Sequence, residues 1–176
     1  MRRTTIVIGV MTTFGIGLAL GAAWAKKSVD ASLYVGAAPE AAAAALLELA
    51  EEHAGRGSWQ RIHVARVYFL SGDPARGQEI FDAIIDKKVE ASDWIRMGRI
   101  HHEAGDWESA RRAFEKVIEL EPDDEDWMAT IGAYHNLHGD RARAEELFRR
   151  SFEDDPDDHW NLANAAGSYV GVEPQW

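Results

Sequence analysis

The sequence predicts an all-α protein built from stacked antiparallel helix pairs, because one block of residues recurs every 33 to 34 positions. The two clearest copies are marked by Trp94 and Met128, and their equivalent residues lie 34 positions apart. A more divergent copy precedes them at a spacing of 33 residues and lacks the closing proline. Recurrence at this period is typical of helical repeat arrays, in which each unit buries its apolar face against its neighbours.

Each repeat is predicted to fold as a helix, a turn and a second helix. Apolar residues have helical spacing across 95–100, and a second helical stretch covers about 108–120. At each turn a glycine is expected to end the first helix in the left-handed conformation, and the aspartate after it to cap the second helix. The three turns are Gly72-Asp73, Gly105-Asp106 and Gly139-Asp140.

Packing inside each pair is predicted from a small residue on the first helix and a phenylalanine on the second. The small residue lets the two helices approach closely, and the phenylalanine fills the space between them. One pair cannot bury its apolar face alone, so successive pairs must stack. The small positions are Ala65, Gly98 and Gly132, and the phenylalanines are Phe81, Phe114 and Phe148.

These units resemble the tetratricopeptide repeat family, whose pattern is Trp-x2-Leu-Gly-x2-Tyr, then Ala-x3-Phe, then Pro. The resemblance is specific for residues 91–158 and weaker for residues 57–90. It departs from the pattern where His101 and His135 replace the tyrosine. The signature residues are Gly72, Phe81, Trp94, Gly98, Gly105, Ala110, Phe114, Pro122, Gly132, Gly139, Ala144, Phe148 and Pro156.

The resemblance implies a right-handed superhelix of about three repeats plus capping helices, an α-solenoid with a concave groove. It also implies a non-enzymatic adaptor that binds a peptide or partner protein in that groove. The family's groove positions fall on the first helix of each pair. Those selected here are Trp59, Ile62, Arg66, Phe69, Arg99, His102 and Asn136.

Two alternatives stay open within this set of groove residues. Arg66 and Arg99 are suited to bind a partner's carboxylate, but an arginine at such a position also pairs readily with an acid on the neighbouring helix. Ile62 and Phe69 belong to the core instead if the first repeat packs against the helix predicted at residues 39–54.

Residues 1–25 are predicted to be a secretory signal peptide. Arg2 and Arg3 precede an apolar run across about 6–22, and small residues at Ala23 and Ala25 form the expected cleavage site. This pattern predicts export to the periplasm. The alternative is an uncleaved anchor in the inner membrane that faces the periplasm, because the run approaches the roughly 20 residues that span a bilayer.

The remaining boundaries follow from composition. Residues 26–38 are expected to form an irregular leader, and the alanine- and leucine-rich stretch 39–54 to form a helix that caps the first repeat. A closing helix is predicted across 159–171, so the repeat domain covers 39–171. Residues 172–176 are expected to be a loose tail.

Composition and motifs exclude several functional classes. The net charge is −11, and it becomes −13 when the signal is removed with Arg2 and Arg3; such a surface repels nucleic acid and anionic lipid. The absence of cysteine excludes disulfides and thiol catalysis. The sequence holds no recognisable nucleophile, phosphate-binding or dinucleotide motif, so no enzyme activity, cofactor or metal is predicted.

A histidine cluster provides the alternative function of a metal- or cofactor-handling envelope protein. His101, His102, His135 and His138 are crowded into two neighbouring helices, and His135 and His138 share a helix face. Against this alternative, His101 and His135 occupy a packing position of the repeat. The acidic clusters 123–126 and 153–158 lack the pattern of a calcium loop and are expected to cap helices.

Overall fold

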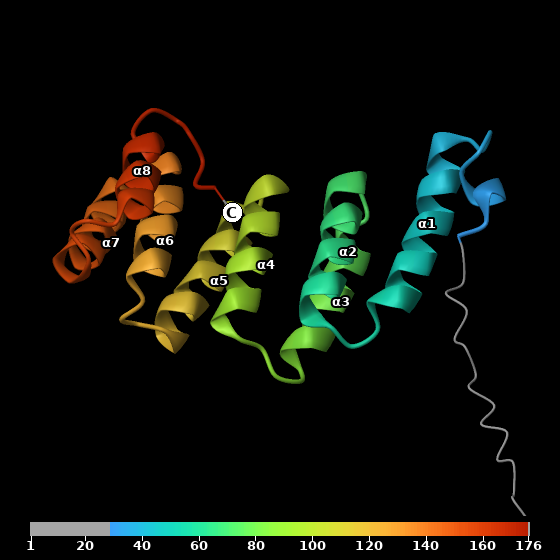
Figure 1. Ribbon diagram of the computed structural model, residues 1–176, viewed down its shortest axis with the longest axis horizontal. Helices are drawn as coiled ribbons and strands as arrows, with labels where there is room; N and C mark the ends of the chain where they lie inside the picture. Colours follow the sequence, from blue (N-terminus) through green and yellow to red (C-terminus); the bar gives the residue numbers. More distant parts are fainter. Residues whose placement is uncertain (1–28, 176) are drawn as a thin grey trace, which may run out of the picture.

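The computed structural model describes residues 29–175, so the predicted signal peptide or anchor lies outside the described residues. Within residues 29–175 the regular structure is entirely helical (Figure 1). None of the helices there has the length and apolar character needed to cross a membrane. The helices are η1 (Ala31–Leu33, 3-10), α1 (Pro39–Ala54), α2 (Ser58–Ser71), α3 (Pro74–Ile85), α4 (Ala91–Glu103), α5 (Trp107–Leu120), α6 (Glu125–Leu137), α7 (Arg141–Asp154) and α8 (His159–Ser168).

The helices form the predicted stack of pairs. α2 packs along α3, α4 along α5 and α6 along α7, and these pairs follow one another along the length of the molecule (Figure 1). α8 packs on α6 in the place of a further first helix, while α1 precedes the array and packs on α2. The all-α architecture of stacked helix pairs, similar to a tetratricopeptide-repeat α-solenoid, is therefore confirmed.

The Gly-Asp turns have the predicted geometry. Gly105 has φ +81°, and the side chain of Asp106 accepts a 3.0 Å hydrogen bond from the backbone nitrogen of Ser109. The other two turns share the positive φ of the glycine and the side-chain cap of the aspartate. The acidic clusters cap helices as well, since Asp124 begins α6 and Asp158 begins α8 through side-chain bonds to backbone nitrogens.

The predicted packing of glycine against phenylalanine also holds. A Cβ atom added at Gly98 would lie 2.4 Å from Cε1 of Phe114, and Phe114 is 0% exposed. Gly132 has the same relation to Phe148. In the first pair the arrangement is different, because Phe69 on α2 covers Gly77 on α3. In this pair, therefore, a phenylalanine ring of the first helix fills the space beside a glycine of the second helix.

The C-terminal region differs from the prediction in two respects. α8 ends at Ser168, before the predicted limit of 171, because Gly171 takes a positive φ of +79° and reverses the chain. Residues 172–175, which were expected to form a loose tail, return from α8 toward α4 (Figure 1), and Pro174 is buried. At the other end, the leader predicted to be irregular contains η1.

Candidate functional site

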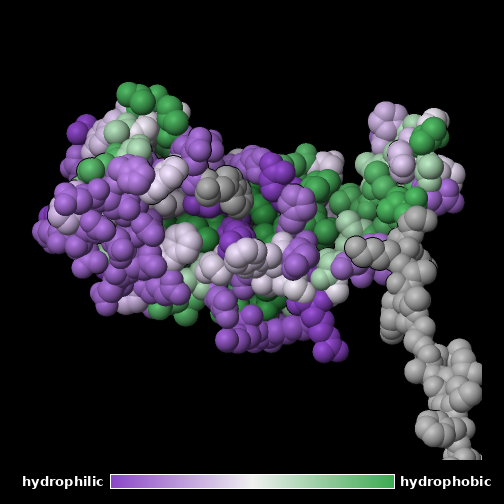
Figure 2. All heavy atoms as spheres, viewed as in Figure 1, coloured by the Kyte–Doolittle hydropathy of each residue, from purple (hydrophilic) through white to green (hydrophobic). Residues whose placement is uncertain are grey.

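A hollow of about 350 Å³ lies between successive first helices of the stack. α2, α4 and α6 provide its walls, and the C-terminal tail provides one further residue. Figure 2 shows the face on which these helices lie: hydrophilic residues cover most of the α6–α8 end, apart from a hydrophobic patch at its top, and hydrophobic residues are visible between α2 and α4. The lining residues are His63, Arg66, Arg99, His102, Glu103, Tyr134 and Glu173.

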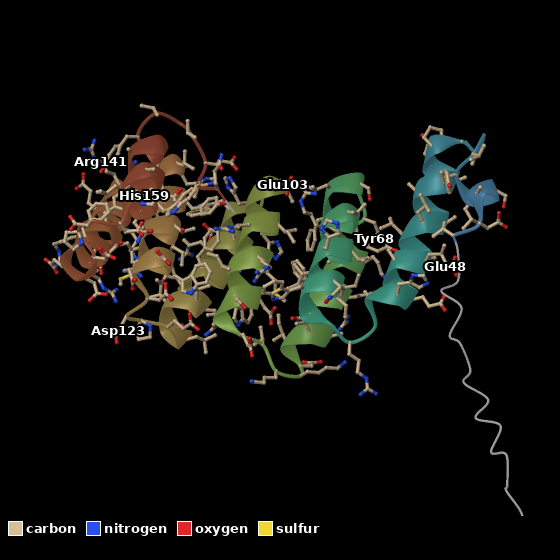
Figure 3. All side chains as sticks on the ribbon, viewed as in Figure 1. Glu48, Tyr68, Glu103, Asp123, Arg141 and His159 are labelled. Carbon is tan, nitrogen blue, oxygen red and sulfur yellow. The ribbon has the colours of Figure 1, made fainter. Side chains whose placement is uncertain are left out.

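Arg66 and Glu103 form a bidentate ion pair across the hollow. Nε of Arg66 donates a 2.6 Å hydrogen bond to one carboxylate oxygen of Glu103, and a terminal nitrogen bonds to the other. Figure 3 shows Glu103 on the part of α4 that lies beside α2. The hydrogen bond to Glu103 raises the pKa of Arg66. Both side chains are more than one-third exposed, so the pair links two repeats but contributes little to stability.

Arg99 lines the same hollow but is not the exposed cation expected from the sequence. Arg99 is only 8% exposed, and burial lowers the pKa of its guanidinium group. The guanidinium interacts with the hydroxyl of Tyr134, whose pKa is raised to about 12 by burial. Arg99 thus forms part of the base of the hollow, and its replacement would disturb the packing of α4 on α6 as well as any ligand.

Three other predicted groove residues contact neighbouring helices: Ile62 is buried, and Phe69 and Asn136 are half-buried. Ile62 is 2% exposed and packs in the cluster that includes side chains of α1. Phe69 lies 5.0 Å from Phe81 and 4.9 Å from His101, measured between ring centroids. Asn136 donates a 2.9 Å hydrogen bond to the hydroxyl of Ser168, because α8 covers that part of α6. These three side chains stabilise contacts between helices.

Trp59 remains on the surface of α2. It is 56% exposed, and the guanidinium carbon of Arg96 lies 3.7 Å from the centre of its ring, within the range of a cation–π contact. A second hollow of about 400 Å³ continues from Arg99 toward α8 and includes the 62% exposed Trp160. Aromatic side chains therefore lie near both ends of the first-helix face.

Apart from Glu103, which lies at a groove position of α4, three lining residues of the hollow were not selected from the sequence. Tyr134 is adjacent to a groove position on α6, but nothing in the repeat pattern singles it out. His63 likewise falls between groove positions of α2. Glu173 follows the repeat domain, and no local signal predicts that its segment returns to the groove.

The four histidines considered as metal or cofactor ligands lie in three separate environments. His102 and His138 contact each other, with 2.9 Å between Nδ1 and Nε2, and His138 stacks on Trp107. His101 packs in the aromatic group of Phe69. His135 contacts Asp140 at 3.1 Å. In residues 29–175 no three His, Asp or Glu side chains are grouped so as to hold a metal ion.

Burial lowers the pKa of both His101 and His135 below the ordinary histidine value. At His135 the contact with Asp140 favours the protonated ring, yet this histidine is only 1% exposed and the cost of desolvating the charged ring is larger. Both rings are therefore harder to protonate in the folded chain than in the unfolded chain, where a histidine has a pKa of about 6.5.

The free energy of unfolding is expected to fall as the pH drops through about 6.5. Below that pH the unfolded chain binds protons that the folded chain does not, so each buried histidine lowers stability by up to about 1.4 kcal/mol per pH unit until its own folded pKa is reached. Urea denaturation between about pH 7.5 and 5.5 measures this slope. His135→Gln should make the slope shallower, and an unchanged slope would contradict this assignment.

The sequence pattern of the tetratricopeptide repeat family matches residues 91–124, which hold α4 and α5. These residues are therefore similar to one tetratricopeptide repeat. Searching the curated proteins gave no match to the chain. Tetratricopeptide repeats in general mediate contacts between proteins and are not catalytic, and they stack so that the first helices line a shared surface. In this protein that surface contains the hollow beside Arg66 and Glu103.

Proposed function

We propose that this protein is a non-enzymatic adaptor of the bacterial cell envelope that binds a peptide or partner protein along its first helices. The hollow between α2, α4 and α6 carries this proposal, because consecutive repeats combine there into one site with both charged and aromatic groups. The predicted signal peptide supports an envelope location, and the tetratricopeptide repeat supports a protein partner.

Two exposed side chains on α2 are the best places to test this proposal. Trp59 offers an aromatic surface of the kind that dominates binding energy at interfaces, and Arg66 offers a cation beside the hollow. Both are accessible, so their removal should affect a partner more than the fold. Arg99 is a poor test residue because it is buried.

The double variant Trp59→Ala, Arg66→Ala is expected to weaken partner binding by about 2 kcal/mol or more, since a tryptophan buried at an interface commonly contributes that much. The protein would be used to capture partners from envelope extract, followed by titration of the captured protein. The melting temperature should change little, because exposed ion pairs contribute little to stability.

A matched control is available on the second helix of the next pair. In α5, Arg111 forms an exposed ion pair with Glu108 at 3.0 Å, and Leu120 is 51% exposed. The variant Arg111→Ala, Leu120→Ala removes one exposed arginine and one large apolar side chain, as the test variant does, but away from the hollow. Equal loss of affinity in both variants would show that the partner does not bind along the first helices.

A further inference from the structure

The C-terminal tail, residues 172–175, is directed back onto the first-helix face by the end of α8. Gly171 has a φ of +79°, and the backbone nitrogen of Val172 donates a 2.9 Å bond to the carbonyl of Gly167. The nitrogen of Gly171 also bonds to the carbonyl of Ser168 at 3.4 Å. Together these bonds form the Schellman arrangement that ends a helix and reverses the chain. The course of the tail is therefore set by a defined turn.

One side chain of the tail, that of Glu173, contacts the site. Oε1 of Glu173 lies 3.2 Å from Nε2 of His102, and Glu173 lines the same hollow as Arg66 and Arg99. Pro174 is buried, whereas Glu173 and Gln175 on either side of it are exposed. The tail thus presents a carboxylate to the first-helix face, and the proline that follows this carboxylate is buried.

The charges around Glu173 explain why a carboxylate is held there. The chain has a net charge of −11, so most of its surface repels a further carboxylate. The hollow is an exception, because the guanidinium groups of Arg66 and Arg99 line it and a ring nitrogen of His102 lies within hydrogen-bond distance of the Glu173 carboxylate. Its one other acid, Glu103, is already bonded through both oxygens to Arg66.

We propose that residues 172–175 are an intramolecular ligand of the hollow, and that its partner is an extended segment in which an acidic residue precedes an apolar one, as Glu173 precedes Pro174. This inference rests on the proposed binding function and specifies its ligand. A partner must displace the tail, so the tail lowers the apparent affinity of the protein for that partner.

An intramolecular ligand of this kind requires a minimum affinity of the tail segment for the hollow. A segment tethered by a short linker has an effective concentration on the order of millimolar. A tail that occupies the hollow most of the time must therefore bind, as a separate peptide, with a Kd below roughly 1 mM. If the hollow is open about one-tenth of the time, the intact protein should bind that peptide about tenfold more weakly than a protein without the tail contacts.

The test compares two proteins and two peptides. The tail variant carries V172G, E173S, P174G and Q175S and keeps Gly171, so that the end of α8 is unchanged. The probe is the peptide Gly-Val-Glu-Pro-Gln, acetylated and amidated so that the glutamate is its only charge. The second peptide has glutamine in place of that glutamate. Binding is followed by NMR chemical shifts of the protein, with peptide added to several millimolar.

The expected result is a Kd below roughly 1 mM for the probe with the tail variant, about tenfold weaker binding to the intact protein, and weaker binding of the glutamine peptide. Shifts should concentrate on Arg66, His102 and Tyr134. Equal binding of the probe to both proteins, or no binding to the tail variant at millimolar peptide, would overturn the intramolecular ligand. Those results leave the proposed function standing if Trp59→Ala, Arg66→Ala still loses the captured partner.

Discussion

Phe114→Ala is expected to lower the free energy of unfolding by about 3–5 kcal/mol, the usual cost of removing a fully buried phenylalanine. Phe114 is 0% exposed and belongs to the apolar cluster that joins α4, α5, α6 and α7. Its ring stacks on Tyr134 with 4.9 Å between centroids and fills the space beside Gly98. Removing it therefore loosens both the α4–α5 pair and the contact of that pair with α6.

Urea denaturation, monitored by the circular dichroism signal of the helices, measures this loss, because unfolding of the stack removes that signal. Leu120→Ala on the same helix is the control: Leu120 is 51% exposed, so its loss should cost far less. If the two variants had equal stability, Phe114 would not be the packing centre of the second repeat. A broadened transition in Phe114→Ala would show that the two ends of the stack unfold separately.

The fold could be predicted from the sequence because its determinants are local and recur. Each Gly-Asp turn specifies the end of one helix and the start of the next, and the small residue and phenylalanine specify how the pair packs. These features repeat at a fixed period, so each copy supports the interpretation of the others. Asp106 caps α5 as predicted, and Phe114 lies against Gly98 as predicted.

The site was predicted less completely because it depends on contacts between helices, and these contacts do not recur from one repeat to the next. Whether Ile62 is exposed depends on α1, which precedes the repeats, and whether Asn136 is exposed depends on α8, which follows them. Arg99 is buried because α6 brings Tyr134 over it. Glu173 reaches the hollow only because Gly171 reverses the chain. The periodic pattern of the repeats does not determine any of these contacts.

Gly98→Val is expected to destabilise the protein by about 3 kcal/mol through overpacking. A Cβ atom at this position would lie 2.4 Å and 2.6 Å from two ring atoms of Phe114, closer than carbon atoms approach without displacement. The ring has little room to move, because Trp107 and Tyr134 contact it. Replacing glycine within a helix usually gains up to about 1 kcal/mol in helix propensity, so a net loss would show that packing decides this position.

A double-mutant cycle with Phe114→Leu identifies the cause of that loss. Leucine lacks Cε1 and Cζ, two of the three ring atoms nearest to the added Cβ of residue 98, at the cost of some apolar burial of its own. In this background Gly98→Val should cost at least about 1 kcal/mol less than in the wild type, the size of coupling expected for two residues in contact. Denaturation curves of the four proteins give the coupling directly. Additive losses would mean that valine disturbs the helix backbone, and that Gly98 is required for a reason other than space for Phe114.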